Sequence, residues 1–233
     1  MGFSSLRHGL AISLALACAG GTAARADLTV HMAATDVKTG VVDARTAYFA
    51  KGRARFDWSH YVGIVDFTKG VVMVMDMTAK SYAKITLADL KKGNGSSPAI
   101  SGAKTGLAFK TVKTGDKLTI NKRQAQKVVL SVNGKPLIEA WLSSSLKPDE
   151  VVDFCATAPY SLNGLISPEV LELLRQSKEM GLAVRVNNML DNVKLELQDA
   201  SSSAIAPAVF SAPTGYSLVK PKDMLTPLLG DKP

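Results

Sequence analysis

The sequence predicts a mainly β protein of the α+β class, in which antiparallel strands form a sheet and a short helical insertion covers it. Three observations indicate this architecture. Short runs rich in Val, Ile, Tyr and Phe recur along residues 28–142 and 182–219. Turn-forming residues separate successive runs, as in an antiparallel meander. Apolar residues at helical spacing are confined to the segment 148–180.

Residues 1–26 have the order of a secretory signal peptide. Arg7 precedes an apolar run at 10–21, and Ala24-Arg25-Ala26 stands at the exit. The run is about 12 residues long, whereas a membrane-spanning helix needs roughly 20. We therefore expect export to the periplasm and removal of the signal peptide. A less favoured alternative is a bacterial lipoprotein anchored at Cys18.

The remaining segment, 27–233, is long enough for a single domain with a sizeable core. Its one cysteine, Cys155, excludes an internal disulfide, and apolar neighbours predict a buried thiol. Removal of Arg7 and Arg25 leaves 26 basic against 20 acidic residues, a net charge of +6. The basic residues are scattered, which argues against nucleic-acid binding. Peripheral contact with an anionic membrane stays open.

The first half of the domain is predicted to consist of short strands. Leu28, Val30 and Met32 share one face of the first strand because side chains alternate along a strand. A turn at Lys51-Gly52 divides the next run into two strands. A loop rich in Gly, Ser and Pro follows at 91–102. The predicted strands are 28–35, 46–59 as two strands, 61–67, 71–77 and 81–87.

A second group of strands follows this loop. Asn133-Gly134 is the strongest hairpin signal in the chain, because both residues tolerate the positive φ of a type I′ turn. After the helical insertion the strand pattern returns and continues nearly to the end. The predicted strands are 107–115, 116–122, 126–132, 135–142, 182–190, 192–200 and a short one at 216–219.

The helical insertion is predicted at 148–180. Ser167-Pro168-Glu169 provides an N-cap, a proline at the first helical position and an early acidic residue. Leu173 and Leu174 then fall on the apolar face of a helix over 168–180, and Gly181 can end it. A shorter helix is predicted to begin at Pro148.

The strand at 71–77 is unusual because it is apolar on both faces. Met73, Met75 and Met77 alternate with Val72 and Val74, whereas a strand with one solvated face should alternate apolar and polar residues. Either this strand is buried on both faces, or one face lines something apolar.

Catalysis finds little support in the sequence. His31 and His60 have no other histidine or cysteine at metal-ligand spacing. The chain has no G-x-S-x-G element for a serine nucleophile. No catalytic residue, metal ligand or cofactor is therefore predicted, and the protein is expected not to be an enzyme.

Several motifs occur in the order found in a known family. They are Arg55 on an early strand, IVDFTKG and MDMTAKSYAKI within 64–85, TGDKLTIN at 114–121, IEAWLSSSL at 138–146, and a turn at 210–216. This succession resembles an exported bacterial family of unknown function related to the periplasmic lipoprotein carrier LolA (the LolA-like superfamily). The chain departs from the family pattern after TGDKLTIN, where it has Lys122, Arg123, Ala125 and Val128.

The resemblance implies a strongly curved antiparallel sheet, an incomplete barrel, whose concave side is covered by helices. A strand in such a sheet turns one face to the cavity, and methionines suit a cavity for acyl groups because they are unbranched and adaptable. The alternative is that the methionines fill an ordinary core. The candidate ligand-binding residues of the apolar cavity are Met73, Met75, Met77, Tyr82, Trp141, Leu173 and Leu174.

Three functions follow as hypotheses. The first is a periplasmic, non-catalytic binding or carrier protein for a lipid, acyl chain or lipoprotein, held between the sheet and the helices. The second is an envelope interaction or sensor module that binds a protein partner, for example through a sheet edge. The third and weakest is an exported enzyme of unrecognised type.

Overall fold

The computed structural model describes residues 27–89, 109–146, 175 and 178–224. The sequence predictions for the signal peptide, for Cys18, for Cys155, for the loop at 91–102 and for the helix starting at Pro148 lie outside these residues.

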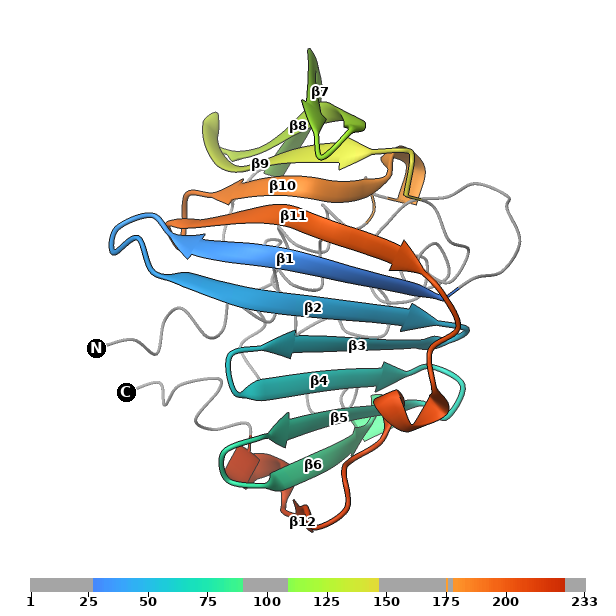
Figure 1. Cartoon of the computed structure of the whole chain (residues 1–233). Coiled ribbons are helices and arrows are strands. Elements are labelled where there is room, and N and C mark those ends of the chain that lie inside the picture. Colours follow the sequence, from blue (N-terminus) through green and yellow to red (C-terminus); the bar gives the residue numbers. More distant parts are fainter. Residues whose placement is uncertain (1–26, 90–108, 147–174, 176–177, 225–233) are drawn as a thin grey trace.

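Twelve strands make up the described fold, and they belong to one sheet (Figure 1). The first six are β1 (Leu28–Asp36), β2 (Val42–Ala50), β3 (Arg53–Trp58), β4 (Tyr61–Asp66), β5 (Val71–Asp76) and β6 (Ser81–Thr86). The others are β7 (Phe109–Ile120), β8 (Arg123–Val132), β9 (Lys135–Ser143), β10 (Leu182–Asn188), β11 (Val193–Ser202) and β12 (Ser217–Leu218). This confirms the mainly β class.

The sheet is open, because its two outermost strands are β12 and β7. The strand order is β12-β6-β5-β4-β3-β2-β1-β11-β10-β9-β8-β7. The described sheet is thus an incomplete barrel, as the family resemblance implied. Neighbouring strands are antiparallel except at one edge, where the short β12 runs parallel to β6. The meander prediction did not include this parallel pair, in which β12 adds a short strand to the β6 edge of the sheet.

Two sharp turns lie where glycine and asparagine predicted them. Asn133 and Gly134 both have positive φ, 49° and 78°, between β8 and β9. Gly52 has a φ of 67° between β2 and β3. One boundary prediction was wrong: 107–115 and 116–122 are not two strands, because β7 continues through a register shift between Lys113 and Lys117. The Thr114-Gly115-Asp116 sequence therefore makes a bulge and not a turn.

The helix predicted at 168–180 is confirmed at its described residues, Arg175 and 178–180. Gly181 follows with a φ of 118°, the left-handed region that favours glycine at a helix end. A Cβ at this position would lie 2.1 Å from the carbonyl oxygen of Ser143. Glycine is thus required here both by conformation and by space.

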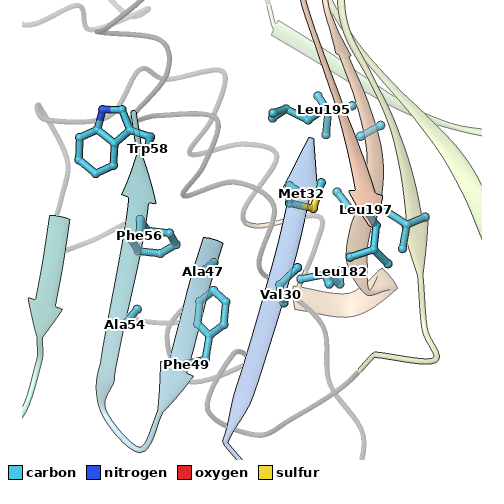
Figure 2. Close-up of a cluster of buried hydrophobic side chains, with 14 of the residues drawn as sticks. Val30, Met32, Ala47, Phe49, Ala54, Phe56, Trp58, Leu182, Leu195 and Leu197 are labelled. Atoms are coloured by element: carbon cyan, nitrogen blue, oxygen red, sulfur yellow. The ribbon is translucent and has the colours of Figure 1, made fainter. Parts of the chain in front are cut away.

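Buried apolar side chains form two clusters on opposite faces of the sheet. The larger cluster includes Val72 and Val74 of β5, whereas the smaller one includes Met73 and Met75 of the same strand. We call the face with the larger cluster the inner face and the opposite one the outer face. Figure 2 shows the inner cluster; its labelled members are Val30, Met32, Ala47, Phe49, Ala54, Phe56, Trp58, Leu182, Leu195 and Leu197.

A segment after β11 crosses the outer face. We call residues 203–212 the strap; they include the 3₁₀ helix η1 (Pro207–Phe210). Figure 1 shows the strap running from the end of β11 toward β4 and β5. Its start is held by Asp27, whose carboxylate accepts a hydrogen bond from the Ile205 N–H at 2.7 Å. Its end is held by Arg55, whose Nη1 donates to the Val209 carbonyl at 2.8 Å.

Candidate functional site

The methionine stripe of β5 lies under the strap. Met75 has no exposed surface and Met73 is 7% exposed, and both belong to the outer cluster with Phe210 of the strap. The guanidinium of Arg53 lies 4.6 Å from the centre of the Phe210 ring. The strand is therefore buried on both faces, and the protein itself supplies the partner of these two methionines. A ligand role for them stays a prediction, one that requires the strap to move.

The other candidates near this stripe are less deeply buried. Tyr82 packs against the outer cluster as a partly buried residue. Met77 lies beyond the end of β5 and is 38% exposed. Its sulfur accepts a hydrogen bond from the Tyr216 hydroxyl at 3.3 Å. The structure thus brings Met73, Met75 and Tyr82 together and leaves Met77 at the margin.

Trp141 lies far from the methionine stripe in the strand order, on β9. Its register partners are Lys127 on β8 and Arg185 on β10. Both cations lie over its ring, with Lys127 Nζ at 5.2 Å and the Arg185 guanidinium carbon at 5.8 Å from the centre. It alternates along β9 with the buried Ala140 and Leu142, and it packs as a partly buried residue against the inner cluster. The remaining candidates, Leu173 and Leu174, lie outside the described residues.

The inner face carries a polar group that the sequence analysis did not single out. Trp58 is the last residue of β3, lies on this face and is 3% exposed. Its burial agrees with the alternation of Ala54, Phe56 and Trp58 along the strand. Its indole Nε1 is buried, and no described residue accepts a hydrogen bond from it. Tyr61 stacks beside it with ring centres 6.3 Å apart. A buried donor without an acceptor costs about 1–3 kcal/mol, so this position is an unusual one within an apolar cluster.

A charged pair lies directly beside Trp58. Arg45 of β2 is the register partner of Trp58 on β3, and its Nε lies 3.6 Å from a carboxylate oxygen of Asp43. Burial lowers the pKa of Arg45, while Asp43 and Asp191 act to raise it. Because arginine has a very high ordinary pKa, it stays charged. One end of the inner face therefore presents an indole donor next to a guanidinium, at the margin of a wide apolar surface.

The described residues include the two histidines of the mature chain, His31 and His60, but no cluster of metal ligands. Among these residues, no group of three or more His, Cys, Asp or Glu side chains lies close enough to hold a metal ion. The Nδ1 of His31 lies 3.1 Å from the Thr46 hydroxyl, and that of His60 lies 3.2 Å from the Ser59 hydroxyl. No helix among the described residues is long and apolar enough to cross a membrane.

Sequence comparisons leave the chain without a match. No protein-family model matches it, and no curated protein does.

Several solved structures are similar to this chain at low sequence identity. One is PNGF-II, with a TM-score of 0.47 and 11% identity over 88% of this chain and 33% of that one. Another is the Pseudomonas aeruginosa MucA/MucB complex, with a TM-score of 0.42 and 9% identity over 94% and 64%. The chain thus spans about a third of the first and less than two thirds of the second.

A LolA superfamily protein from Nitrosomonas europaea is also similar. Its TM-score is 0.30, with 8% identity over 88% of this chain and 97% of that one. The class defined by the described fold is an open, antiparallel half-barrel with an apolar inner face.

Proposed function

We propose that this protein is a periplasmic, non-catalytic binding or carrier protein whose ligand carries an acyl chain, as a lipid or a lipoprotein does. The observation that carries the proposal is the inner face, where a wide cluster of apolar side chains ends at a buried indole donor that finds no acceptor among the described residues. Residues 1–26 support export, because they have the order of a signal peptide.

The apolar surface favours a hydrocarbon partner. Its members come from strands on both sides of β1, so it extends across most of the sheet. Ligand sites in proteins are mainly apolar and contain a few polar groups that orient the ligand. Among the described residues no second sheet packs on this face. Phe49, Phe56 and Leu195 are at most 1% exposed, so an acyl chain lying along β2, β3 and β11 would contact them only after a rearrangement that opens the inner cluster.

The polar end of this face favours a ligand with an acceptor group. A pure hydrocarbon would leave the Trp58 Nε1 unpaired, whereas an ester carbonyl, carboxylate or phosphate could accept its hydrogen bond. Arg45 beside it would favour an acceptor that carries negative charge. The proposed orientation therefore has the head group at Trp58 and Arg45 and the chain among the apolar residues of the inner cluster.

The first test is native mass spectrometry of the mature protein purified gently from the periplasm, followed by organic extraction. Bound fatty acid or phospholipid would support the proposal. A clean mass of the protein alone, with no uptake of added lipid or acylated peptide, would contradict it.

A pair of variants tests the orientation. Trp58→Phe removes the indole donor but keeps an aromatic ring, and Trp141→Phe makes the same change on β9, which is separated from β3 by four strands of the sheet. We expect Trp58→Phe to weaken the binding of a fluorescent fatty acid about tenfold, and to leave the binding of diphenylhexatriene, which has no acceptor, unchanged. Trp141→Phe should affect neither probe. Equal effects of the two variants on the fatty acid would contradict the proposed orientation.

A second candidate function is binding of a protein segment at the β7 edge. β7 is twelve residues long and in the described chain pairs only with β8. Lys110, Lys113 and Lys117 lie along it, and Lys113 forms an ion pair with Glu179 at 3.2 Å. An exposed edge offers unpaired backbone groups to an added strand, and these lysines would favour an acidic one. Hydrogen exchange of the β7 amides tests this: a synthetic acidic β-strand peptide should slow it, and a basic peptide of matched pattern should not.

A further inference from the structure

Large apolar side chains are exposed at one place in particular. Nine such residues are exposed in the described chain, and five of them lie in two turns or directly beside one. The β1–β2 turn carries Val37 and Val41, which are 65% and 64% exposed, and Val42 begins β2 directly after it and is 63% exposed. The β10–β11 turn carries Met189 and Leu190, which are 43% and 45% exposed. We call these five residues the apolar tip.

The two turns lie against each other although about 150 residues separate them in the sequence. The Val37 N–H donates to the Asn192 carbonyl at 2.7 Å. β1 and β11 pair as far as Asp36, which precedes the β1–β2 turn, and Val193, which follows the β10–β11 turn. The five side chains therefore belong to one contiguous end of the sheet, and Figure 1 shows the β1–β2 turn projecting beyond the neighbouring turns.

Both turns are held by their own hydrogen bonds. The Asp36 carboxylate accepts the N–H groups of Lys38 and Thr39, each at 2.8 Å. The Asp36 N–H also donates to the Val41 carbonyl at 2.9 Å. In the other turn, the side chain of Asn188 accepts the Leu190 N–H at 3.0 Å and donates to Asp191. The exposure of the apolar side chains is thus a feature of defined turns.

The shape and chemistry of the tip fit a lipid surface. A stable protein interface buries about 800 Å² on each partner. An interface of this size needs a broad surface, whereas the tip consists of the ends of two hairpins. Apolar side chains on a narrow projection can instead enter the boundary between lipid head groups and acyl chains. Lys38 lies at the apex of the β1–β2 turn and is exposed, so its ammonium can reach phosphate groups while its stem stays among the valines.

We infer that the apolar tip is the element by which this protein contacts a membrane surface. Contact there would bring the ends of β1 and β11 to the lipid. These strands lead directly to Met32, Ala34 and Leu195 of the inner cluster. The inference rests on the exposed turns alone and does not depend on the proposed ligand.

The test uses the mature protein and vesicles of mixed phosphatidylethanolamine and phosphatidylglycerol. The tip variant is Val37→Ser, Val41→Ser and Leu190→Ser combined. The matched control combines Val112→Ser, Leu118→Ser and Leu218→Ser, which are exposed apolar residues elsewhere on the sheet. Because all six side chains are exposed, both variants should fold, and circular dichroism checks this.

We expect the wild type and the control to float with the vesicles, and the tip variant to lose about tenfold or more in vesicle affinity. A tryptophan introduced by Val37→Trp should shift its emission to the blue on lipid addition, whereas Val112→Trp should not. Absence of vesicle binding by the wild type, or equal binding by all three proteins, would overturn the inference. So would a dimer in solution that only the tip variant disrupts, because the tip would then be a protein interface.

Failure of this inference can be told apart from failure of the proposed function. Fatty acid uptake by the wild type in solution, without vesicle binding, would overturn the membrane contact and leave the proposed function standing. Vesicle binding without any uptake of acyl ligand would overturn the proposed function and leave the membrane contact standing.

Discussion

The two faces of the sheet bury apolar side chains in different ways. On the outer face, a small cluster is matched to one segment of the chain, the strap, which is held by Asp27, Arg53 and Arg55. On the inner face, a much wider cluster ends at an indole donor for which the described residues provide no acceptor. The difference teaches that burial alone does not identify a ligand site. A buried polar group without a partner among the described residues is the observation by which the inner face, the proposed ligand site, differs from the outer face.

The largest effect is expected at the centre of the inner cluster. Leu195→Ala removes a side chain with no exposed surface and should lower the free energy of unfolding by about 4 kcal/mol. Met75→Ala on the outer face should lower it by about 3 kcal/mol, because the strap can settle into part of the space. Urea denaturation measures both. Leu218→Ala, at an exposed position, should change it by less than about 0.5 kcal/mol. A larger loss of unfolding free energy for Met75→Ala than for Leu195→Ala would contradict this comparison of the two faces.

The next effect concerns the attachment of the strap. Phe210→Ala removes the side chain that the strap contributes to the outer cluster, and should lower the free energy of unfolding by about 2–3 kcal/mol. It should also make Met73 and Met75 more susceptible to peroxide, because their cover is lost. Mass spectrometry of the oxidised peptides measures this, with Met32 of the inner face as the internal control. Unchanged oxidation of both outer methionines would mean that the strap is not their main cover.

A smaller effect is expected for the polar anchor of the strap. Arg55 binds the Asp57 carboxylate with two nitrogens, at 2.7 and 3.0 Å, as well as the Val209 carbonyl. Arg55→Lys keeps the charge but cannot make all three contacts. We expect a loss of about 1–2 kcal/mol and faster hydrogen exchange at Val209. Arg123→Lys is the control, since within the described part of the chain the Arg123 side chain donates to one group, the Asn121 carbonyl of the adjacent turn. An equal loss in both variants would show that the anchor adds nothing specific.

The smallest effect is a pH dependence on the outer face. A hydrogen bond from Lys194 lowers the pKa of Glu196 below its ordinary value of 4.5; burial opposes this shift, and Arg185 adds to it. Because the pKa is lower in the folded state, the stabilisation is present above the ordinary value and is lost as the pH falls through the folded value. Glu196→Gln should therefore cost less than about 1 kcal/mol at neutral pH, and nothing below that window. Urea denaturation of the wild type and the variant, at pH values above and below this window, tests the prediction. A loss that persists in acid would contradict it.

Local sequence features predicted most strand positions and the tightest turns. Asn133-Gly134 and Gly52 have the positive φ that their residue types allow. The β7 bulge was mistaken for a turn because Thr114-Gly115-Asp116 is also a turn-like sequence. The strap and the parallel β12 were not predicted, since each depends on contacts with residues far away in the chain.

The candidate site was only partly accessible to sequence reasoning. The methionines of β5 were predicted to be covered, and Met73 and Met75 are, but no local signal says that the strap covers them. Trp58 was missed because its alternation with Phe56 marks it as buried without revealing whether its Nε1 finds an acceptor. The apolar tip was missed because Val37 and Leu190 become neighbours only when β1 pairs with β11.

The sequence by itself determined the mainly β class, the strand positions and the sharp turns, because these follow from alternation and from the φ angles that glycine and asparagine permit. Only the tertiary structure decided which face of β5 meets the strap, which buried indole finds no acceptor among the described residues, and which turns form the apolar tip. The physical reason is that side chains alternate between the two faces of a strand, and this alternation does not specify what packs on either face. Their surroundings depend on strands and segments that are remote in sequence.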